Sequence, residues 1–272
     1  MTESTPVLRA GCLLINTLTG EDLLLPRSTA FQSSALTAEG QPIAESDPSL
    51  SVVTLKAYGY KSYWEVSREL VDDSTANILD TLARGAAVSL AAAYGDHLAN
   101  GTGTGQPQGY VNCTVGKQGP TGTATSLGTQ TTAGQGTDLL VDLYASIAEP
   151  YAMSPSLAVL GRNASLAVAK KLRDSTGRPV LDTRPRVPWA SADLLGVPYF
   201  VDPFTPAMAA NAKSLAYGDW SRYAVRVVKG VRLERSDEFK FSSDLVAFKA
   251  VIRMDAQIVD TGALKLFQNG AS

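Results

Sequence analysis

The sequence is poor in the side chains on which most metal sites and many catalytic sites depend. Its 272 residues include one histidine, His97, and two cysteines, Cys12 and Cys113. A Cys/His zinc site takes three or four ligands at short spacing, and a disulfide scaffold takes several cysteine pairs. The sequence therefore predicts no metal centre, no cofactor and no disulfide framework, and two isolated thiols are typical of a reducing compartment.

Charged residues and long apolar runs are scarce as well. Charged residues make up 18% of the chain, against about 25% in an average protein. The most apolar stretch, Gly85–Tyr94, is far shorter than the roughly 20 residues that cross a bilayer. The first 25 residues lack a basic start followed by an apolar run, which predicts no signal peptide. With 44% hydrophobic residues the chain is expected to fold, as one large domain or two small ones.

The small net charge of −2 hides an asymmetry between the two parts of the chain. Residues 1–101 hold 6 basic and 12 acidic residues, a sum of −6, and residues 102–272 hold 18 and 14, a sum of +4. Such a difference is most often solvated surface. The sharper hypothesis is that the acidic part of one subunit meets the basic part of a neighbour.

The first hundred residues predict an arm, a ribbon and a long helix. Residues 1–27 show no sustained period and are interpreted as an arm that lies on another surface. Residues 28–67 predict two strands joined by a polar loop, the second being the Tyr- and Trp-containing run Ser51–Ser67. Asp72 and Asp73 are suited to a helix start, an apolar stripe follows, and Asn100-Gly101 is a stop signal. This helix would be about 26 residues long, twice the usual length.

The remainder predicts loops, a compact region and one long strand. Residues 101–136 are rich in Gly, Thr and Gln, and predict loops with one short strand at Tyr110–Val115. Apolar residues alternate from Phe248 to Ile258 with Val251 as the exception, which predicts a strand that Val231–Arg235 and Ala263–Phe267 could flank. Helices are expected at Asp138–Glu149 and Asn163–Arg173 and short strands at Leu157–Leu160, Leu194–Val201, Ser214–Tyr217 and Ala224–Val228.

No motif indicates catalysis. The run Gly101-Thr-Gly-Thr-Gly105 resembles a phosphate loop, but it lacks Gly-Lys-Ser/Thr and follows a helix, so a helix-terminating loop is the favoured interpretation. His97 would have to serve any Ser-His-Asp triad, no nucleophile signature accompanies it, and it is interpreted as structural. The acidic pairs Asp72/Asp73 and Asp237/Glu238 are interpreted as a helix start and a turn rather than an acid–base pair. A small hydrolase or transferase stays open only if a pocket joins His97 to Ser or Asp.

One cluster of basic residues leaves a second alternative open. Residues 162–186 contain seven Arg or Lys and two acids, and no aromatic residue interleaves with them. A nucleic-acid-binding module would need these charges to form one continuous face. The favoured interpretation is a solvated helix face and a loop. The cluster is represented by Arg162, Lys170, Lys171, Arg173 and Arg178.

The order of the motifs resembles the major capsid proteins of tailed phages with the Hong Kong 97-type fold. The stretches that carry this resemblance are Thr37–Glu45, Val52–Lys56, Trp64–Leu70, the helix from Asp72 to Asn100, Asn163–Val180, Leu194–Val201 and Ala216–Arg222. The most specific is Asn100-Gly-Thr-Gly-Thr-Gly-Gln-Pro-Gln-Gly109, because family members often carry "GTGxxQPxG" there. The resemblance covers about residues 28–268.

The resemblance implies an α+β fold with a long spine helix, an elongated antiparallel sheet, an extended β-ribbon loop and an N-terminal arm. The implied divisions are an arm (1–27), an extended loop (28–67), a peripheral segment with the spine helix (68–136), an axial domain (137–228) and the peripheral long strands (229–272). Arm and loop would reach over neighbours. The inter-subunit contacts expected in the loop are Glu39, Glu45, Lys56, Lys61 and Trp64.

The function implied is that of a non-enzymatic subunit of an icosahedral phage head. It would self-assemble into pentamers and hexamers around double-stranded DNA, without reading its sequence, in the bacterial cytoplasm. A portal, a separate scaffolding protein and a decoration protein are the expected partners, since the capsid pattern starts within about thirty residues of Met1. A nanocompartment shell of the encapsulin type is the alternative.

The founding member of the family joins its subunits through a loop lysine and an asparagine, assisted by a glutamate. Lys56 and Lys61 are candidate lysines here, but Asp244 falls near the asparagine position and Val251 near that of the glutamate. The resemblance therefore predicts that no covalent crosslink forms.

Overall fold

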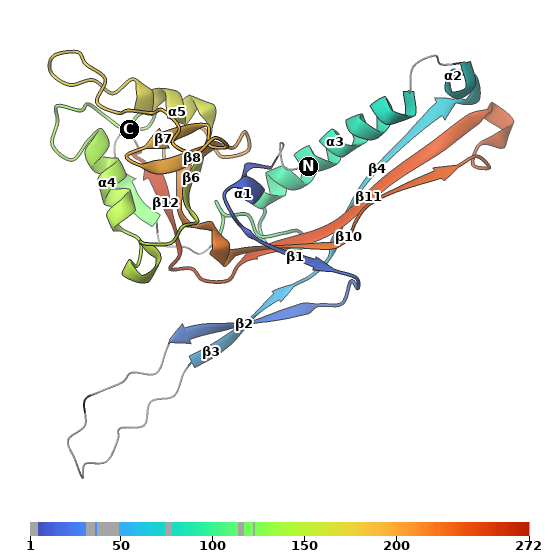
Figure 1. Ribbon diagram of the computed structural model, residues 1–272, viewed down its shortest axis with the longest axis horizontal. Coiled ribbons are helices and arrows are strands. Elements are labelled where there is room, and N and C mark those ends of the chain that lie inside the picture. The colour runs from blue at the N-terminus through green and yellow to red at the C-terminus, as the bar shows by residue number, and fades with distance from the viewer. Residues whose placement is uncertain are drawn as a thin grey trace, which may run out of the picture.

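The computed structural model describes residues 5–30, 36, 49–73, 78–113, 117–121 and 123–271. Figure 1 shows two bodies joined by long strands and a ribbon that leaves them both. One body holds the helix α3 (Ile78–Asn100) on a four-stranded sheet. The other holds a six-stranded sheet with the shorter helices α4 (Thr137–Ala145) and α5 (Asn163–Lys170). None of the helices in the described residues combines the length and the apolar character that a bilayer crossing requires.

The four-stranded sheet has the order β1-β10-β11-β4. Its central strands are β10 (Tyr223–Ser236) and β11 (Leu245–Ile258), which run antiparallel. Strand β4 (Tyr58–Ser67) pairs antiparallel with β11, and β1 (Leu13–Thr17) pairs parallel with β10. The alternation expected for β11 is confirmed. Its apolar parity packs in the core with α3, while Lys249 and Arg253 lie on the opposite face.

The six-stranded sheet has the order β5-β12-β9-β6-β8-β7. Its strands are β5 (Lys117–Thr121), β6 (Leu157–Gly161), β7 (Ala192–Leu194), β8 (Val197–Val201), β9 (Lys213–Asp219) and β12 (Leu264–Asn269). The predicted single strand Leu194–Val201 is in fact part of a hairpin. Leu195 and Gly196 both have positive φ, which is the backbone that a two-residue hairpin turn requires.

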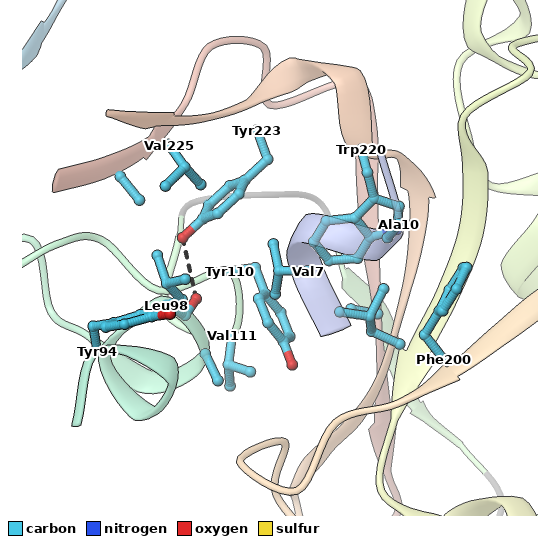
Figure 2. Packing of buried hydrophobic residues seen from close by; sticks show 14 of the residues in the cluster. Val7, Ala10, Tyr94, Leu98, Tyr110, Val111, Phe200, Trp220, Tyr223 and Val225 are labelled. Carbon is cyan, nitrogen blue, oxygen red and sulfur yellow. Dashed lines mark hydrogen bonds between the residues drawn. The ribbon is translucent and has the colours of Figure 1, made fainter. Parts of the chain in front are cut away.

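Two large cores stabilise these bodies. The first joins α3 and the four-stranded sheet to one side of the six-stranded sheet, and it contains Tyr94, Tyr110, Trp220 and Tyr223 (Figure 2). The phenol of Tyr223 donates a hydrogen bond to the carbonyl of Leu98, 3.1 Å away. The second core fills the space between α4, α5 and the six-stranded sheet. A small third cluster of Val66, Val246 and Phe248 lies at the far end of β4 and β11.

The arm departs from expectation because its first part packs on its own chain. Val7 lies in the short helix α1 (Pro6–Arg9), and Ala10 directly follows it. Both side chains are in the first core, next to Trp220 and Tyr110 in Figure 2. Strand β1 continues the four-stranded sheet. Residues 5–17 therefore complete this subunit's own body, since the buried Val7 and the β1–β10 pairing need no second chain.

The ribbon also starts earlier than predicted. Strand β2 (Leu23–Ala30) begins inside the predicted arm and pairs antiparallel with β3 (Ser49–Leu55). The predicted strand Ser51–Ser67 is broken at Lys56 and Ala57, so that β3 belongs to the ribbon and β4 to the four-stranded sheet.

The long helix is preceded by a separate short one. Asp72 and Asp73 end the helix α2 (Arg68–Asp73) rather than starting α3. Ser67 begins α2, because its hydroxyl accepts a hydrogen bond from the backbone N–H of Leu70, 3.4 Å away, in the manner of a helix cap. The described part of α3 has 23 residues, against the roughly 26 expected.

The glycine-rich run ends α3 as predicted. The Gly101 N–H donates to the His97 carbonyl at 2.9 Å, and a side-chain carbon at Gly101 would meet the Pro107 carbonyl oxygen at 2.1 Å. The chain then turns back, and the N–H groups of Tyr110 and Val111 donate to the carbonyls of Leu98 and Ala99. These two bonds explain why residues 110–113 form turns instead of the predicted strand.

The C-terminal segment divides between the two sheets. Ala263–Phe267 does not flank β11 as expected, because β12 pairs with β9 and β5. The predicted boundary at residue 229 falls inside β10. The division into axial and peripheral domains stays a prediction.

Candidate assembly surfaces

The ribbon is a surface on which apolar side chains are left exposed by their own chain. Among the described strands, β2 and β3 pair only with each other. Leu24 on β2 is 61% exposed and Val52 on β3 is 59% exposed. Figure 1 shows the ribbon extending away from both bodies. A two-stranded ribbon is marginally stable alone in water, so these apolar side chains suit contact with another molecule.

The five predicted loop contacts do not form one site. Glu39 and Glu45 lie outside the described residues. Lys56 is exposed where the ribbon joins the body, and Lys61 is exposed on β4 opposite Val251. Trp64 lies on the other face of β4, half-buried, with its ring stacked on Phe248 at a centroid distance of 5.8 Å.

A mainly apolar groove runs between the start of α3 and β4, beside Trp64. Its volume is about 330 Å³, and it is lined by Ser62, Trp64, Glu65, Val66, Thr81, Leu82, Gly85, Ala86 and Ser89. The indole N–H of Trp64 is buried, and no acceptor for it lies among the described residues. Strand β4 is also the last strand of its sheet. Its outer edge and this groove are therefore a second uncovered region of the first body.

The face of the four-stranded sheet opposite α3 is mainly basic. A hollow of about 490 Å³ is lined by Gly59, Lys61, Arg232, Glu234, Lys249, Val251 and Arg253. Lys249 forms an ion pair of 2.6 Å with Glu234, and this ion pair lowers the pKa of the Glu234 carboxyl. Two neighbouring ion pairs, Lys240–Glu65 at 2.7 Å and Arg235–Asp237 at 2.8 Å, continue the charged surface.

The predicted basic cluster is exposed on the second body. Arg162 precedes α5 and donates from Nη2 to the Pro203 carbonyl at 2.7 Å, while Lys170 and Lys171 end that helix. Arg173 and Arg178 lie in the turn that follows, and all five side chains are exposed. None of the five makes an ion pair within the part of the chain that the structure describes.

The turn after α5 is organised by Asp174. Its Oδ1 accepts from the N–H and hydroxyl of Thr176 and from the N–H of Arg178, at 2.8, 2.7 and 2.8 Å. These hydrogen bonds, led by that of the Thr176 hydroxyl, lower the pKa of the Asp174 carboxyl. The turn thus holds Arg173 and Arg178 at the surface.

The residues considered for catalysis have structural partners. The Nδ1 atom of His97 lies 2.7 Å from the phenol of Tyr60, on the neighbouring strand β4. Asp237 pairs with Arg235, and the amides of Gly101, Gly103 and Gly109 donate to carbonyls of the same turn and of α3. In the described part of the chain, no three Asp, Glu, His or Cys side chains gather in a way that could hold a metal ion.

The two positions expected near a crosslink have different surroundings. Asp244 forms an exposed ion pair with Arg68, with 3.2 Å between Oδ1 and Nε. Val251 is buried and lies directly opposite Lys61 in the β11–β4 register. A valine offers no carboxylate at this position.

A buried polar network joins the two bodies, and the sequence interpretation missed it. The Tyr110 phenol donates to Asp202 Oδ2 at 2.7 Å and lies 2.6 Å from the Thr205 hydroxyl. Asp202 Oδ1 accepts from the N–H of Phe204, and Asn100 donates to the Phe204 carbonyl. Burial raises the pKa of the Asp202 carboxyl, although these hydrogen bonds and Arg162 oppose the shift. The signal available in the sequence was an Asp-Pro turn directly after a buried strand.

Arg226 and Asp255 were also missed, and both are buried charged residues in the long strands. Arg226 interrupts the apolar run from Ala224 to Val228, and Asp255 lies between Met254 and Ala256. A charge inside an apolar run is a usable signal, because buried charges are kept only where they have partners.

A family model described as the phage capsid family matches residues 1–269. No curated protein has a sequence that matches this chain.

Solved capsid structures have a similar fold. The capsid of an empty GTA particle, computed with C5 symmetry, has a TM-score of 0.85 and 24% sequence identity, covering 98% of this chain and 91% of that one. The capsid of a native GTA particle has a TM-score of 0.83 and 23% sequence identity, with the same coverage of both chains. A structure from Mycobacterium phage Bobi has a TM-score of 0.70 and 14% sequence identity, covering 99% of this chain and 91% of that one.

Proposed function

This chain belongs to the phage capsid family, and we propose that it builds the icosahedral head of a tailed phage as pentamers and hexamers of itself. It is a major capsid structural protein. The head would enclose double-stranded DNA without reading its sequence. The observation that supports self-assembly is the ribbon, whose Leu24 and Val52 are exposed on strands that pair with no other described strand of their chain.

We assign the parts of the structure to roles in such a shell. The helix α3 and the four-stranded sheet act as the peripheral domain with its spine helix, and the six-stranded sheet and α5 act as the axial domain. The ribbon is the extended loop, which a neighbouring subunit covers. Contacts of this head-to-tail kind close into rings, which suits pentamers and hexamers.

The charge distribution agrees with contacts between unlike parts of neighbouring subunits. Residues 1–101, with a sum of −6, include the ribbon and α3, and residues 102–272 carry +4. The basic cluster around Arg162 and Arg178 belongs to the second part and makes no ion pair within the described chain. Assembly in rising salt is the test of this electrostatic part, and assembly that is insensitive to salt contradicts it.

The remaining expectations about the shell are proposals as well. We propose no enzymatic step, assembly in the host cytoplasm, and the participation of a portal, a separate scaffolding protein and a decoration protein. An encapsulin-type nanocompartment is not favoured by the family match. Particles that contain DNA support the phage head, whereas packaged enzyme would indicate the nanocompartment.

Electron microscopy is the direct test of the proposed function. The purified chain, alone and after coexpression with the other head proteins of its phage, is expected to form closed shells. A chain that stays monomeric under both conditions would contradict the proposal.

The covalent structure of the shell is tested separately. Since Val251 cannot act as a buried carboxylate, assembled particles boiled in denaturant should release a single band of 28.7 kDa. A ladder of multimers on the gel would show that a crosslink forms.

A further inference from the structure

Both strands of the ribbon join the body at one pair of buried charged residues. Arg226 on β10 is 1% exposed and Asp255 on β11 is 2% exposed, and the two lie directly opposite each other in the strand register. Valines flank Arg226 on its strand, but their side chains point to the opposite face of the sheet, so the partners of the buried guanidinium come from other segments. A buried guanidinium has five N–H donors and needs acceptors for them.

The acceptors of Arg226 come from both ends of the ribbon. Its Nε donates to the Thr17 hydroxyl at 3.0 Å and its Nη2 to the Thr19 carbonyl at 2.9 Å, just before β2 begins. Its Nη1 donates to the carbonyl of Leu55 at 2.8 Å and to that of Lys56 at 3.2 Å, where β3 ends. A single side chain therefore holds the chain where it enters the ribbon and where it leaves.

Asp255 holds the same place from the neighbouring strand. Its Oδ2 accepts from the N–H of Lys56 at 2.6 Å, and its Oδ1 accepts from the N–H of Ala256 at 2.8 Å. Both backbone polar groups of Lys56 are thus bound, its N–H by Asp255 and its carbonyl by Arg226. Burial raises the pKa of the Asp255 carboxyl, and the positive charge of Arg226 opposes this shift.

The direction of the ribbon depends on this junction because β2 and β3 pair only with each other among the described strands. We propose that Arg226 and Asp255 are positioning residues that fix the angle at which the ribbon leaves the body, and therefore which part of a second copy it reaches. The inference rests on the proposed function, since the ribbon is taken to contact a neighbouring subunit.

The chemistry of arginine suits this role better than that of any other side chain. Its planar fork presents donors in fixed directions, whereas a lysine ammonium is a point charge with three donors on a flexible stem. A buried charged pair is also weak as a source of stability, because removing the charges from water offsets much of their attraction. Arg226 makes three hydrogen bonds to main-chain carbonyls and one to the Thr17 hydroxyl, in two separate segments, and this pattern favours an orienting role.

Three variants separate orientation from stability. Arg226→Lys keeps the charge and removes the fork, Asp255→Asn removes one charge, and Thr17→Val removes a single acceptor while it keeps the shape of the side chain. Arg232→Lys is the matched control, since Arg232 lies further along the same strand with an exposed side chain.

Hydrogen exchange on the free subunit gives the local readout. In Arg226→Lys and Asp255→Asn the amides at residues 18–22 and 55–57 should exchange about ten-fold faster, and in Thr17→Val those at 18–22 alone should do so. Amides in the paired parts of β10 and β11 should stay at the wild-type rate. Arg232→Lys should change neither region.

Electron microscopy of the same variants gives the functional readout. Arg226→Lys and Asp255→Asn should yield at least about ten-fold fewer closed shells than the wild-type chain. The yield of closed shells from Thr17→Val, which keeps most of the junction, should fall between that of the wild-type chain and those of the other two variants. Where Arg226→Lys fails to fold, the Thr17→Val and Asp255→Asn variants decide.

Two results overturn the inference. One is junction exchange that stays at the wild-type rate, and the other is faster junction exchange with a normal yield of normal shells. Exchange that rises uniformly across β10 and β11 would show a stabilising role only, and it also counts against positioning. If the proposed function is wrong, the wild-type chain itself forms no shells. That result is distinct from either result that would overturn this inference.

Discussion

The six-stranded sheet and the ribbon are made of the same kind of strand but differ in how far their own chain covers them. The side chains of β6, β8 and β9 lie almost wholly in the two large cores, and α4 and α5 complete the packing. On strands β2 and β3, Val53 and Leu55 are buried but Leu24 and Val52 face outward. The sheet is therefore finished within the subunit, whereas the outward-facing side chains of the ribbon are available for contact with another molecule.

Two groups of buried polar residues lie where parts of the molecule meet. The network of Tyr110, Asp202 and Thr205 lies between the two bodies, and the cluster of Arg226 and Asp255 lies at the base of the ribbon. The first lies beside the core that also joins the bodies, and the second joins the body to a ribbon that pairs with no other described strand. Directional hydrogen bonds can fix an angle between such parts, which apolar packing alone does less well.

The largest effect is expected from removing a side chain that completes the finished region. Trp220 is fully buried, donates from its indole to the Ala158 carbonyl at 3.0 Å, and packs edge-on to Tyr110. Trp220→Ala should lower the free energy of unfolding by about 3–5 kcal/mol. Chemical denaturation monitored by circular dichroism measures this loss.

The matched control for Trp220 is an exposed tryptophan in the same body. Trp189 is 60% exposed, so that Trp189→Ala should change the free energy of unfolding by less than about 0.5 kcal/mol. Equal losses in the two variants would show that the first core does not stabilise the fold as its burial indicates.

A smaller, pH-dependent effect is expected at the joint between the two bodies. Burial raises the pKa of Asp202 above its ordinary value of 3.8, so the folded state binds this proton more tightly than the unfolded state. The stability that Asp202 contributes therefore falls as pH rises from that ordinary value through the raised one. Asp202→Asn removes this dependence, and its loss of stability should be larger at about pH 4.5 than at about pH 7.5.

Asp174 provides a comparison of opposite sign. Hydrogen bonds lower its pKa, so its contribution to stability is present above the ordinary value and is lost as pH falls through the lowered one. Asp174→Asn should therefore lose the least free energy of unfolding at acid pH. The loss should be small at any pH, because the turn is exposed. Urea titrations measure these losses, at about pH 4.5 and about pH 7.5 for Asp202→Asn and at about pH 3 and about pH 4.5 for Asp174→Asn. A loss that is the same at both pH values in Asp202→Asn would contradict the role assigned to burial there.

Local patterns in the sequence predicted the elements of the finished regions well. Alternation along β11 indicated its long strand and its inner face, because one side of the sheet packs with α3. The stop at Gly101 followed from its residue type, and the structure adds the close approach of the Pro107 carbonyl. The family resemblance, carried by motifs in order, is confirmed over nearly the whole chain.

Long-range pairing was what the local patterns could not supply. Nothing in Ala263–Phe267 shows that it leaves the long strands and joins β9, because its alternation fits either sheet. The return of Tyr110 to the end of α3 depends on a turn nine residues long, and α1 depends on a core built by distant strands. Arg226 and Asp255 likewise gained a role only when both ends of the ribbon met beside them.

The smallest effect on stability, and the sharpest test of the comparison, is expected in the ribbon. Val52→Ser removes an exposed apolar side chain from β3, and it should lower the free energy of unfolding by no more than about 1 kcal/mol, since packing within the chain is hardly touched. Closed shells, counted by electron microscopy at equal protein concentration, should nevertheless be strongly reduced, because this side chain lies on the surface that we propose a neighbour covers. Val141→Ser makes the same substitution at an exposed valine of α4, in the finished body. A similar loss of shells in both variants would mean that the ribbon is no more dependent on a second molecule than the sheet is.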